Sequence, residues 1–449
     1  AVVGAPVLLA LAYAATHPEF ILSGYAGRSF SLAERLLTQP RVLLFYLGLL
    51  VFPTRHALGL YHDDFALSHG LFTPFTTVLA LAAWIALLAV AFRYRRKAPV
   101  LVFAFAWYLA GHAMESTVLP LEMVFEHRNY VPSIGPILAL ALGIWVGLKR
   151  LAGNERLAYT TVGIVTLTLA FVTHSRAYTW SDIHVLLETM VRHHPQAART
   201  HGFYAEVLIN TRADPQKAFY HLQQYSRLSP GTINGLGEML RLVKSAQRSP
   251  DSSKVTANEE ISLFEAPLSN DMATLTQLEQ LLLEEIERRI RSRPISGSTV
   301  KTIADLQRCL YQGASICVDL APELARWSEL ALANPAIVSH HRAILLLVSA
   351  KIQAWLGNVA RGKAYAEMAV DTAPGEVHFL IELAKLHLAL EEYQRGLALV
   401  ERIKKEDLQF GYRMSEVAAL EAEIRSKLAD ERDGKPTAIA PRIETRNPL

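Results

Sequence analysis

Hydrophobic positions are concentrated in the first part of the chain. Four stretches there carry no charged residue and are long enough, or nearly so, to cross about 30 Å of hydrocarbon. These are Phe75–Phe92, Ala98–Met114, Ile134–Leu148 and Leu157–Thr173. A helix on the surface of a soluble protein has a polar stripe, and these stretches have none. They predict membrane-spanning helices, with buried helices of a soluble core as the alternative.

Two further apolar stretches are harder to place. Val42–Phe52 is short and is followed by Pro53, which favours a re-entrant or interfacial helix. Ala1–Ala15 opens the chain without a Met or a basic segment, so it is a poor signal peptide. We expect it to be the end of a transmembrane helix whose beginning precedes Ala1, and the sequence leaves open whether further spans come before that helix.

Basic residues indicate how the spans are oriented. Two short turns between spans are rich in Lys and Arg, which are enriched on the cytoplasmic side. The basic residues are Arg93, Arg95, Arg96 and Lys97 in one turn, and Lys149, Arg150 and Arg156 in the other. We therefore expect a transmembrane domain over residues 1–175, with loops 16–74 and 119–133 facing outward together with everything after His174.

The rest of the chain is more polar, and its apolar residues recur with the period of an α-helix. A shift of about 34 residues aligns small and apolar positions near the C-terminus, as in the tetratricopeptide repeat (TPR). The aligned pairs are Ala350 with Ala384, Leu356 with Leu390, and Ala364 with Ala398. We predict an all-α protein in which a polytopic transmembrane domain precedes a soluble TPR-like α-solenoid, a fold that offers a concave surface to protein partners.

The predicted solenoid has four parts. The first repeats occupy residues 176–248, and further repeats occupy residues 301–433. Between them, residues 249–300 contain a loop at Ser249–Glu259 and an amphipathic helix at Leu275–Ile290. Residues 434–449 are predicted to form a flexible tail.

Composition narrows the function classes. Of 449 residues, 51% are hydrophobic and 19% are charged, which excludes a disordered chain. The formal net charge of +3 does not indicate nucleic acid as a partner. The two cysteines, Cys309 and Cys317, would lie about 12 Å apart on one straight helix, too far to bond. A turn at Gly313 would bring them together, so a disulfide and a pair of packed thiols both stay open.

Candidate chemistry is concentrated on the predicted outward side. Six ionisable residues fall within seventeen positions: His112, Glu115, Glu122, Glu126, His127 and Arg128. Ionisable groups near membrane depth usually line a polar cavity, and Arg suits a phosphate headgroup. We expect Arg128, His127 and His112 to bind a donor phosphate. The alternative is that Arg128 pairs with a Glu and only fixes the loop.

Carboxylates supply the catalytic candidates. Glu115, Glu122 or Glu126 would act as base toward an acceptor or hold a divalent cation such as Mg²⁺ or Mn²⁺. The adjacent Asp63 and Asp64, beside His62, are weaker candidates because paired Asp residues also form turns and caps.

One motif resembles a known family. Glu126-His127-Arg128-Asn129-Tyr130-Val131-Pro132-Ser133 is similar to a motif of the transmembrane and TPR-repeat O-mannosyltransferases, and the resemblance runs from about Ser31 to Pro230. It implies a glycosyltransferase of the GT-C class that uses a polyprenyl-phosphate-linked sugar and an extracytoplasmic protein acceptor. For a bacterial member, it implies an inner-membrane protein with periplasmic repeats. The acidic residue that GT-C enzymes carry in their first outward loop would precede Ala1.

Three functions follow from these observations. The first is that glycosyltransferase. The second is a non-catalytic membrane-anchored TPR scaffold for an envelope complex such as a pilus or secretion machine. The third is a polymerase or ligase of lipid-linked glycans.

Overall fold

The computed structural model describes residues 28–432 apart from 55–56, 153–154, 249–261, 269–270, 375 and 407–413, together with residues 16, 22, 24 and 25. Within these residues every named element is a helix, which confirms the all-α prediction. The predicted N-terminal apolar segment, the Ser249–Glu259 loop and the C-terminal tail lie outside the described residues. Contacts divide the chain into two compact units, Ala1–Ala213 and Asp214–Leu449.

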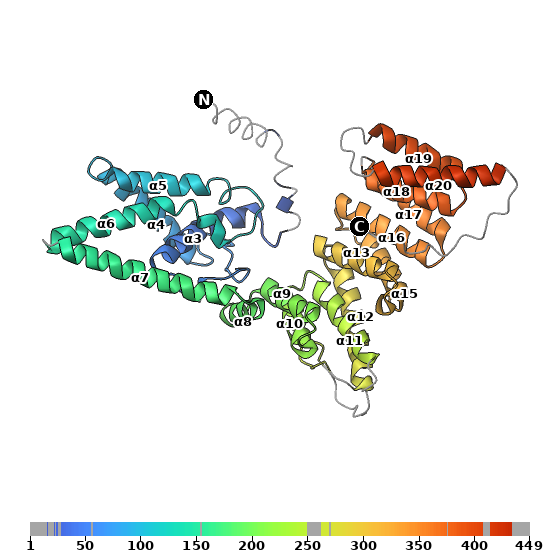
Figure 1. Ribbon diagram of the computed structural model, residues 1–449, viewed down its shortest axis with the longest axis horizontal. Helices are drawn as coiled ribbons and strands as arrows, with labels where there is room; N and C mark the ends of the chain where they lie inside the picture. The colour runs from blue at the N-terminus through green and yellow to red at the C-terminus, as the bar shows by residue number, and fades with distance from the viewer. Residues whose placement is uncertain are drawn as a thin grey trace. The chain divides into compact units, whose positions relative to one another are not determined.

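The N-terminal unit contains a sequence of long helices that pack against their neighbours in chain order (Figure 1). These are α3 (Leu32–Val51), α4 (Thr76–Tyr94), α5 (Pro99–His112), α6 (Ile134–Ala152) and α7 (Glu155–Trp180), followed by α8 (Ile183–His193) and α9 (Ala198–Asn210). The four apolar stretches predicted to be helical are α4 to α7. Two helices that the sequence assigns to the first repeats, α8 and α9, belong to this unit.

Helix α3 is longer than the sequence pattern indicates. The prediction of a short helix at Val42–Phe52 within a long loop was wrong, because the helix begins at Leu32 with a capping box formed by Ser31 and Glu34. Its first half has no apolar pattern because the side it buries is polar. The buried polar side chains are those of Arg35, Thr38 and Gln39.

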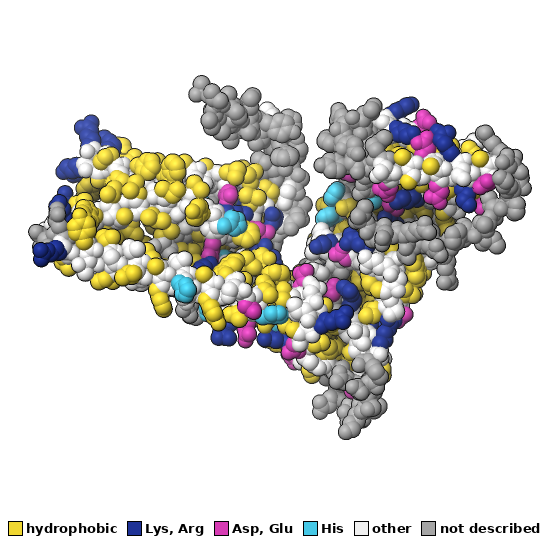
Figure 2. Space-filling model, in the orientation of Figure 1, with side chains coloured by type: hydrophobic (Ala, Val, Ile, Leu, Met, Phe, Trp, Pro, Cys, Tyr) yellow, Lys and Arg dark blue, Asp and Glu magenta, His cyan; other side chains and the backbone are white. Residues whose placement is uncertain are grey.

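Large apolar side chains are exposed over α4 to α7, as the yellow surface of this unit shows (Figure 2). Among them, the most exposed aliphatic and phenylalanine side chains are Ile85 (68%), Phe92 (63%), Leu167 (72%) and Phe171 (69%). Among the described residues, one helix, Thr76–Tyr94, is both long enough and apolar enough to cross a membrane, and Pro99–His112 is apolar but shorter.

The two basic turns lie at the same end of these helices. In Figure 1 the end of α4 and the start of α5 lie at the same end of the bundle as the end of α6 and the start of α7. Dark blue Lys and Arg side chains gather at that end in Figure 2. This placement matches the prediction that both turns face the same side.

The C-terminal unit is an array of helices in which most neighbours along the chain pack together, and α12 and α13 both pack against α15. They are α10 (Pro215–Leu228), α11 (Asn234–Gln247), α12 (Met272–Ser292), α13 (Gly297–Tyr311), α14 (Ser315–Val318), α15 (Ala321–Ala333), α16 (Ser339–Trp355), α17 (Val359–Thr372), α18 (Val377–Ala389), α19 (Tyr393–Glu406) and α20 (Met414–Arg432). The amphipathic helix predicted at Leu275–Ile290 is α12, which buries its apolar stripe.

The repeat spacing is present in the backbone as well as in the sequence. Helix α19 begins and ends one repeat length after α17, and α18 ends one repeat length after α16. The turn inside each pair has a left-handed residue at the same place, Gly357 (φ +86°) and Glu391 (φ +60°). These correspondences make α16–α17 and α18–α19 two copies of one helical hairpin.

Each hairpin depends on a small residue where its two helices meet. A Cβ on Gly362 would lie 2.8 Å from the Ala350 carbonyl oxygen, which is closer than real Cβ atoms approach. One repeat later, a Cβ on Gly396 would lie 3.6 Å from the Ala384 carbonyl oxygen. Ala350 and Ala384 are fully buried in one apolar cluster that runs through both hairpins.

The two cysteines form a disulfide between Cys309 and Cys317. Helix α13 ends at Tyr311, and Gly313 follows with φ +70°, so the chain reverses before α14. The Cα atoms of the two cysteines are 5.8 Å apart as a result. Of the two possibilities left open by the sequence, the structure contains the bonded pair.

Candidate functional site

The ionisable residues of the outward-predicted segments lie at the end of the helices away from the basic turns. Helix α5 ends at His112 and α7 ends at Trp180, and the polar segments follow these ends. Three parts of the chain meet there: residues 59–64 after α3, residues 115–128 after α5, and residues 194–199 from the end of α8 to the start of α9. All belong to the N-terminal unit.

Arg128, the predicted phosphate ligand, is occupied by its own loop. Its Nε lies 3.1 Å from Glu115 Oε2, close enough to pair but not aligned for a hydrogen bond. Its guanidinium also donates to the Glu122 carbonyl oxygen at 2.7 Å and lies over the Phe125 ring. The Arg128 side chain is 11% exposed. Its charge is therefore compensated within the loop that carries it.

Glu122 and Glu126 are ion-paired to basic side chains from other segments. Glu122 pairs with Arg28 at 2.5 Å and with Arg199 at 3.1 Å. Glu126 pairs with Arg176, at the end of α7, at 2.8 Å and lies 3.2 Å from His62 Nε2.

The Glu126 carboxylate is ionised and is held by three neighbouring groups. Burial alone would raise the pKa of Glu126, but the His62 hydrogen bond and the charge of Arg176 hold its pKa below the ordinary value. The backbone N–H of Gly59 donates to the same carboxylate. A carboxylate held in this way is an acceptor for three neighbours and is a poor proton donor or nucleophile.

Asp63 and Asp64 both bind the segment after α8. Asp63 accepts from the Arg199 backbone N–H at 2.8 Å and from its Nε at 3.1 Å. Asp64 Oδ2 lies 2.9 Å from His194 Nδ1. Burial would raise the pKa of Asp64, yet the bond to His194 lowers it below the ordinary value, and the same bond raises the pKa of His194.

The two other predicted phosphate ligands have different surroundings. His112 is buried, stacks on Tyr46 with ring centroids 5.4 Å apart, and has its Nε2 3.4 Å from Asn129 Oδ1. His127 is exposed, and the centroid of its ring lies 4.9 Å from the centroid of the Phe125 ring. No hydrogen bond or ring contact joins His112 to His127 among the described residues, and the phosphate-binding role of these two histidines and Arg128 stays a prediction.

Sequence reasoning missed several residues that organise this region. Arg35 is fully buried and donates to the carbonyl oxygens of Thr117, Leu121 and Glu115. Arg199 and His194 lie far along the chain in an ordinary helix junction, so no local pattern marks them. The Ser31-to-Glu34 capping box was the one available signal for the helix that carries Arg35.

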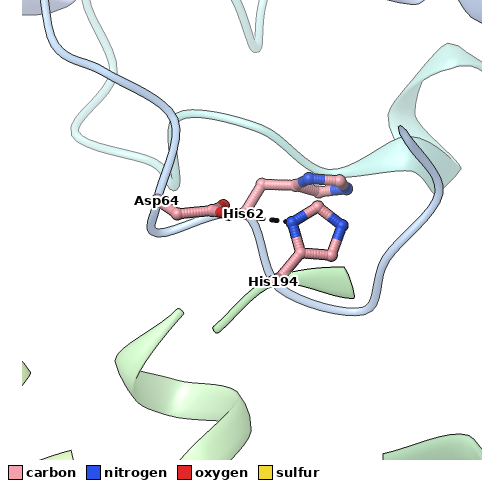
Figure 3. Close-up of side chains that lie close together, drawn as sticks. All are labelled: His62, Asp64 and His194. Atoms are coloured by element: carbon pink, nitrogen blue, oxygen red, sulfur yellow. Dashed lines mark hydrogen bonds and ion pairs between the residues drawn. The ribbon is translucent and has the colours of Figure 1, made fainter. Parts of the chain in front are cut away.

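One group of side chains has the composition of a metal site. His62, Asp64 and His194 each offer a ligand atom, and these atoms all lie within 4.8 Å of one another (Figure 3). The two imidazole rings are nearly perpendicular, with centroids 5.0 Å apart. The sequence placed His62 and Asp64 together but gave no reason to add His194.

No family model and no curated protein matches the chain. Solved structures that are similar to part of this chain include the TPR2AB-domain:pHSP90-complex of yeast Sti1. The similarity covers 56% of this chain and 89% of that chain, with 14% sequence identity and a TM-score of 0.23. Another is Pseudomonas aeruginosa pilF, at 12% identity and a TM-score of 0.28, covering 53% and 92%. Both TM-scores are low, so the repeat assignment rests on the hairpin geometry of this chain.

Proposed function

We propose that this chain is a membrane-anchored scaffold whose C-terminal helical repeats hold protein partners. The observation that carries the proposal is the duplicated hairpin, in which turn conformation, helix ends and helix-contact glycines recur after one repeat length. Stacked hairpins of this kind form extended binding surfaces and contribute little chemistry of their own.

The exposed apolar surface of α4 to α7 supports a multi-pass anchor. A soluble protein seldom exposes a contiguous apolar surface over several long helices, because its contact with water is unfavourable. The short connections from α4 to α5 and from α6 to α7 carry Lys and Arg at one shared end of the bundle, as cytoplasmic turns do.

We place the repeats outside the cytoplasm, in a bacterial periplasm. The Cys309–Cys317 disulfide supports this placement because such bonds persist mainly in oxidising compartments. The partner would then be an extracytoplasmic protein, as in assembly of an envelope complex.

The polar cluster also favours a scaffold over an enzyme. Each candidate carboxylate already pairs with a basic side chain. Apart from the Glu115–Arg128 pair, which lies within one loop, these pairs join loops to the helices α7, α8 and α9. Arg199 alone links Asp63 and Glu122. These ion pairs attach α8 and α9 to the helical bundle. This structural role explains why so many charged side chains lie close together here.

Photo-crosslinking in intact cells tests the scaffold. A photoreactive residue replaces Arg361 on α17 or its repeat equivalent Arg395 on α19, both of which are more than half exposed. Arg93, exposed in the basic turn, is the control position. We expect the two repeat positions to give the same discrete protein adduct and Arg93 not to give it. Absence of an adduct at both repeat positions, or the same adduct at Arg93, contradicts the proposal.

Glycosyl transfer from a polyprenyl-phosphate donor, with Glu115, Glu122 or Glu126 as catalytic group and a divalent cation, stays a prediction that rests on the family resemblance. Its test is Arg128→Ala. An enzyme loses transfer to the acceptor protein while inserting normally in the membrane. A scaffold keeps its partner adduct, with a loss of stability because Glu115 is left without its cation.

A further inference from the structure

Residues His62, Asp64 and His194 lie close together although 130 positions separate Asp64 from His194. His62 and Asp64 come from the segment after α3, and His194 caps the C-terminal end of α8. The C-terminal end of a helix carries partial negative charge, which favours a cation. Three potential ligands therefore converge where two distant segments of the N-terminal unit meet.

His194 has a ring nitrogen without a partner. Its side chain is nine-tenths buried, and its Nδ1 faces Asp64, but its Nε2 has no hydrogen-bond partner among the described residues. Because Nδ1 faces Asp64 at 2.9 Å, Nδ1 is the nitrogen that can share an ion with Asp64, and Nε2 lies on the other side of the ring.

A glycine opens the space beside the two rings. A Cβ at Gly59 would lie 3.1 Å from His194 Nε2 and 3.4 Å from His62 Cε1. The first distance is tighter than ordinary contacts, so a larger residue would press on the rings. Gly59 also donates its backbone N–H to Glu126, which keeps this segment close to the site.

Glu126 has the position of an outer-shell partner. It accepts from His62 Nε2, and Arg176 fixes its other oxygen. Metal-binding histidines commonly donate one ring N–H to a carboxylate while the other nitrogen binds the ion. In this arrangement His62 has its orientation and tautomer set before any metal arrives.

The geometry points to a site for a divalent transition-metal ion of the Zn²⁺ type, bound by His62, Asp64 and His194 with Glu126 as outer-shell partner. Imidazole nitrogen with one carboxylate suits Zn²⁺, whereas Mg²⁺ prefers oxygen ligands. Asp64 is the exposed member and gives the ion a route from solvent. The ion would staple the segment after α3 to the end of α8. This site is independent of the scaffold proposal, because it requires neither a partner nor the C-terminal repeats.

Zinc binding by the full chain tests the site. The protein is purified in detergent with a tag that contains no histidine, stripped with a chelator, and titrated with Zn²⁺ against a chromophoric chelator. We expect about one tight equivalent per chain and a higher unfolding temperature with Zn²⁺. His194→Gln should weaken Zn²⁺ binding at least tenfold. Glu126→Gln should weaken it about 10- to 100-fold, the usual effect of losing an outer-shell partner.

Two controls keep the test decisive. His69→Gln changes an exposed histidine of the same loop and should leave Zn²⁺ affinity unchanged. Co²⁺ replaces Zn²⁺ in the unmodified protein and should give the visible absorption of a four-coordinate site, so the result does not depend on a variant that folds. Equal Zn²⁺ binding by wild type and His194→Gln, or no four-coordinate Co²⁺ spectrum, overturns the proposal. Loss of the partner adduct with Zn²⁺ binding intact would contradict the scaffold alone.

Discussion

At the residue scale, buried charged groups decide how the loops of the N-terminal unit are held. Arg35 is the clearest case because its guanidinium is buried and donates to three backbone carbonyls of the loop after α5. A backbone carbonyl that loses its donor inside a protein is left unsatisfied. One side chain on α3 thus fixes a loop that is distant along the chain.

Replacing Arg35 with Met should destabilise the N-terminal unit by at least about 3 kcal/mol, since several charge-assisted hydrogen bonds are lost at once. Thermal unfolding in detergent measures the change. Arg96→Met, at an exposed position in a basic turn, is the matched control and should stay within about 0.5 kcal/mol of wild type. Equal stability of the two variants would contradict this role of Arg35.

Glu382 makes the stability of the C-terminal unit depend on pH. Burial alone would raise the pKa of Glu382, but Lys351 and Lys385, each with Nζ 3.2 Å from a carboxylate oxygen, hold its pKa below the ordinary 4.5. A carboxyl whose pKa is lower in the folded state stabilises the fold above its ordinary pKa, and this contribution disappears as pH falls through the folded pKa.

Glu382→Gln should therefore cost about 2 kcal/mol at pH 7, and the difference from wild type should narrow steadily below pH 4.5. Hydrogen–deuterium exchange in α16 and α18 measures this difference in local stability at each pH. A difference that is constant from pH 7 to pH 3.5 would contradict an ionised Glu382.

At the element scale, the hairpins follow their sequence pattern closely, whereas α3 does not. The repeat spacing already aligned Ala350 with Ala384, and both are fully buried where helices meet. Helix α3 was recognised only in its apolar half. Its first half buries polar groups whose partners are loop carbonyls, and no local pattern shows those partners.

At the same scale, the Cys309–Cys317 disulfide crosslinks the turn between α13 and α14 like a staple. It closes a loop with a sequence separation of 8, so the loss of chain entropy in the unfolded state corresponds to about 2–3 kcal/mol. The double variant Cys309→Ser with Cys317→Ser should lose that much stability in chemical unfolding. Reductant should lower wild-type stability to the same level and leave the double variant unchanged. An unchanged wild type under full reduction would rule out the staple.

At the scale of the whole molecule, the placement of apolar surface is the dominant feature. The N-terminal unit exposes apolar side chains over α4 to α7, whereas the C-terminal unit buries its apolar residues inside the hairpins. The same kind of residue thus faces outward in one unit and inward in the other. A lipid environment for the first unit and water for the second would satisfy both.

The chain should remain in membranes after washing with high salt and with alkaline carbonate, and detergent should release it. Release by carbonate would contradict a spanning anchor. Introduced cysteines then report orientation, because the two native cysteines are bonded. A cysteine at Arg96 should react with an impermeant maleimide only when the cytoplasmic side is open, and one at His69 should react from the outside. Equal labelling of the two would refute the orientation.

The sequence by itself determined the features that depend on local pattern. Uninterrupted apolar runs gave α4 to α7, and the repeat spacing gave the paired hairpins, because helix period and repeat length are written along the chain. Tertiary structure decided which charged groups meet. The partners of Glu126 and Asp64, which are Arg176 and His194, lie 50 and 130 positions away. Such pairs form only when the helices pack, because the two partners are close in the folded structure although they are far apart along the chain.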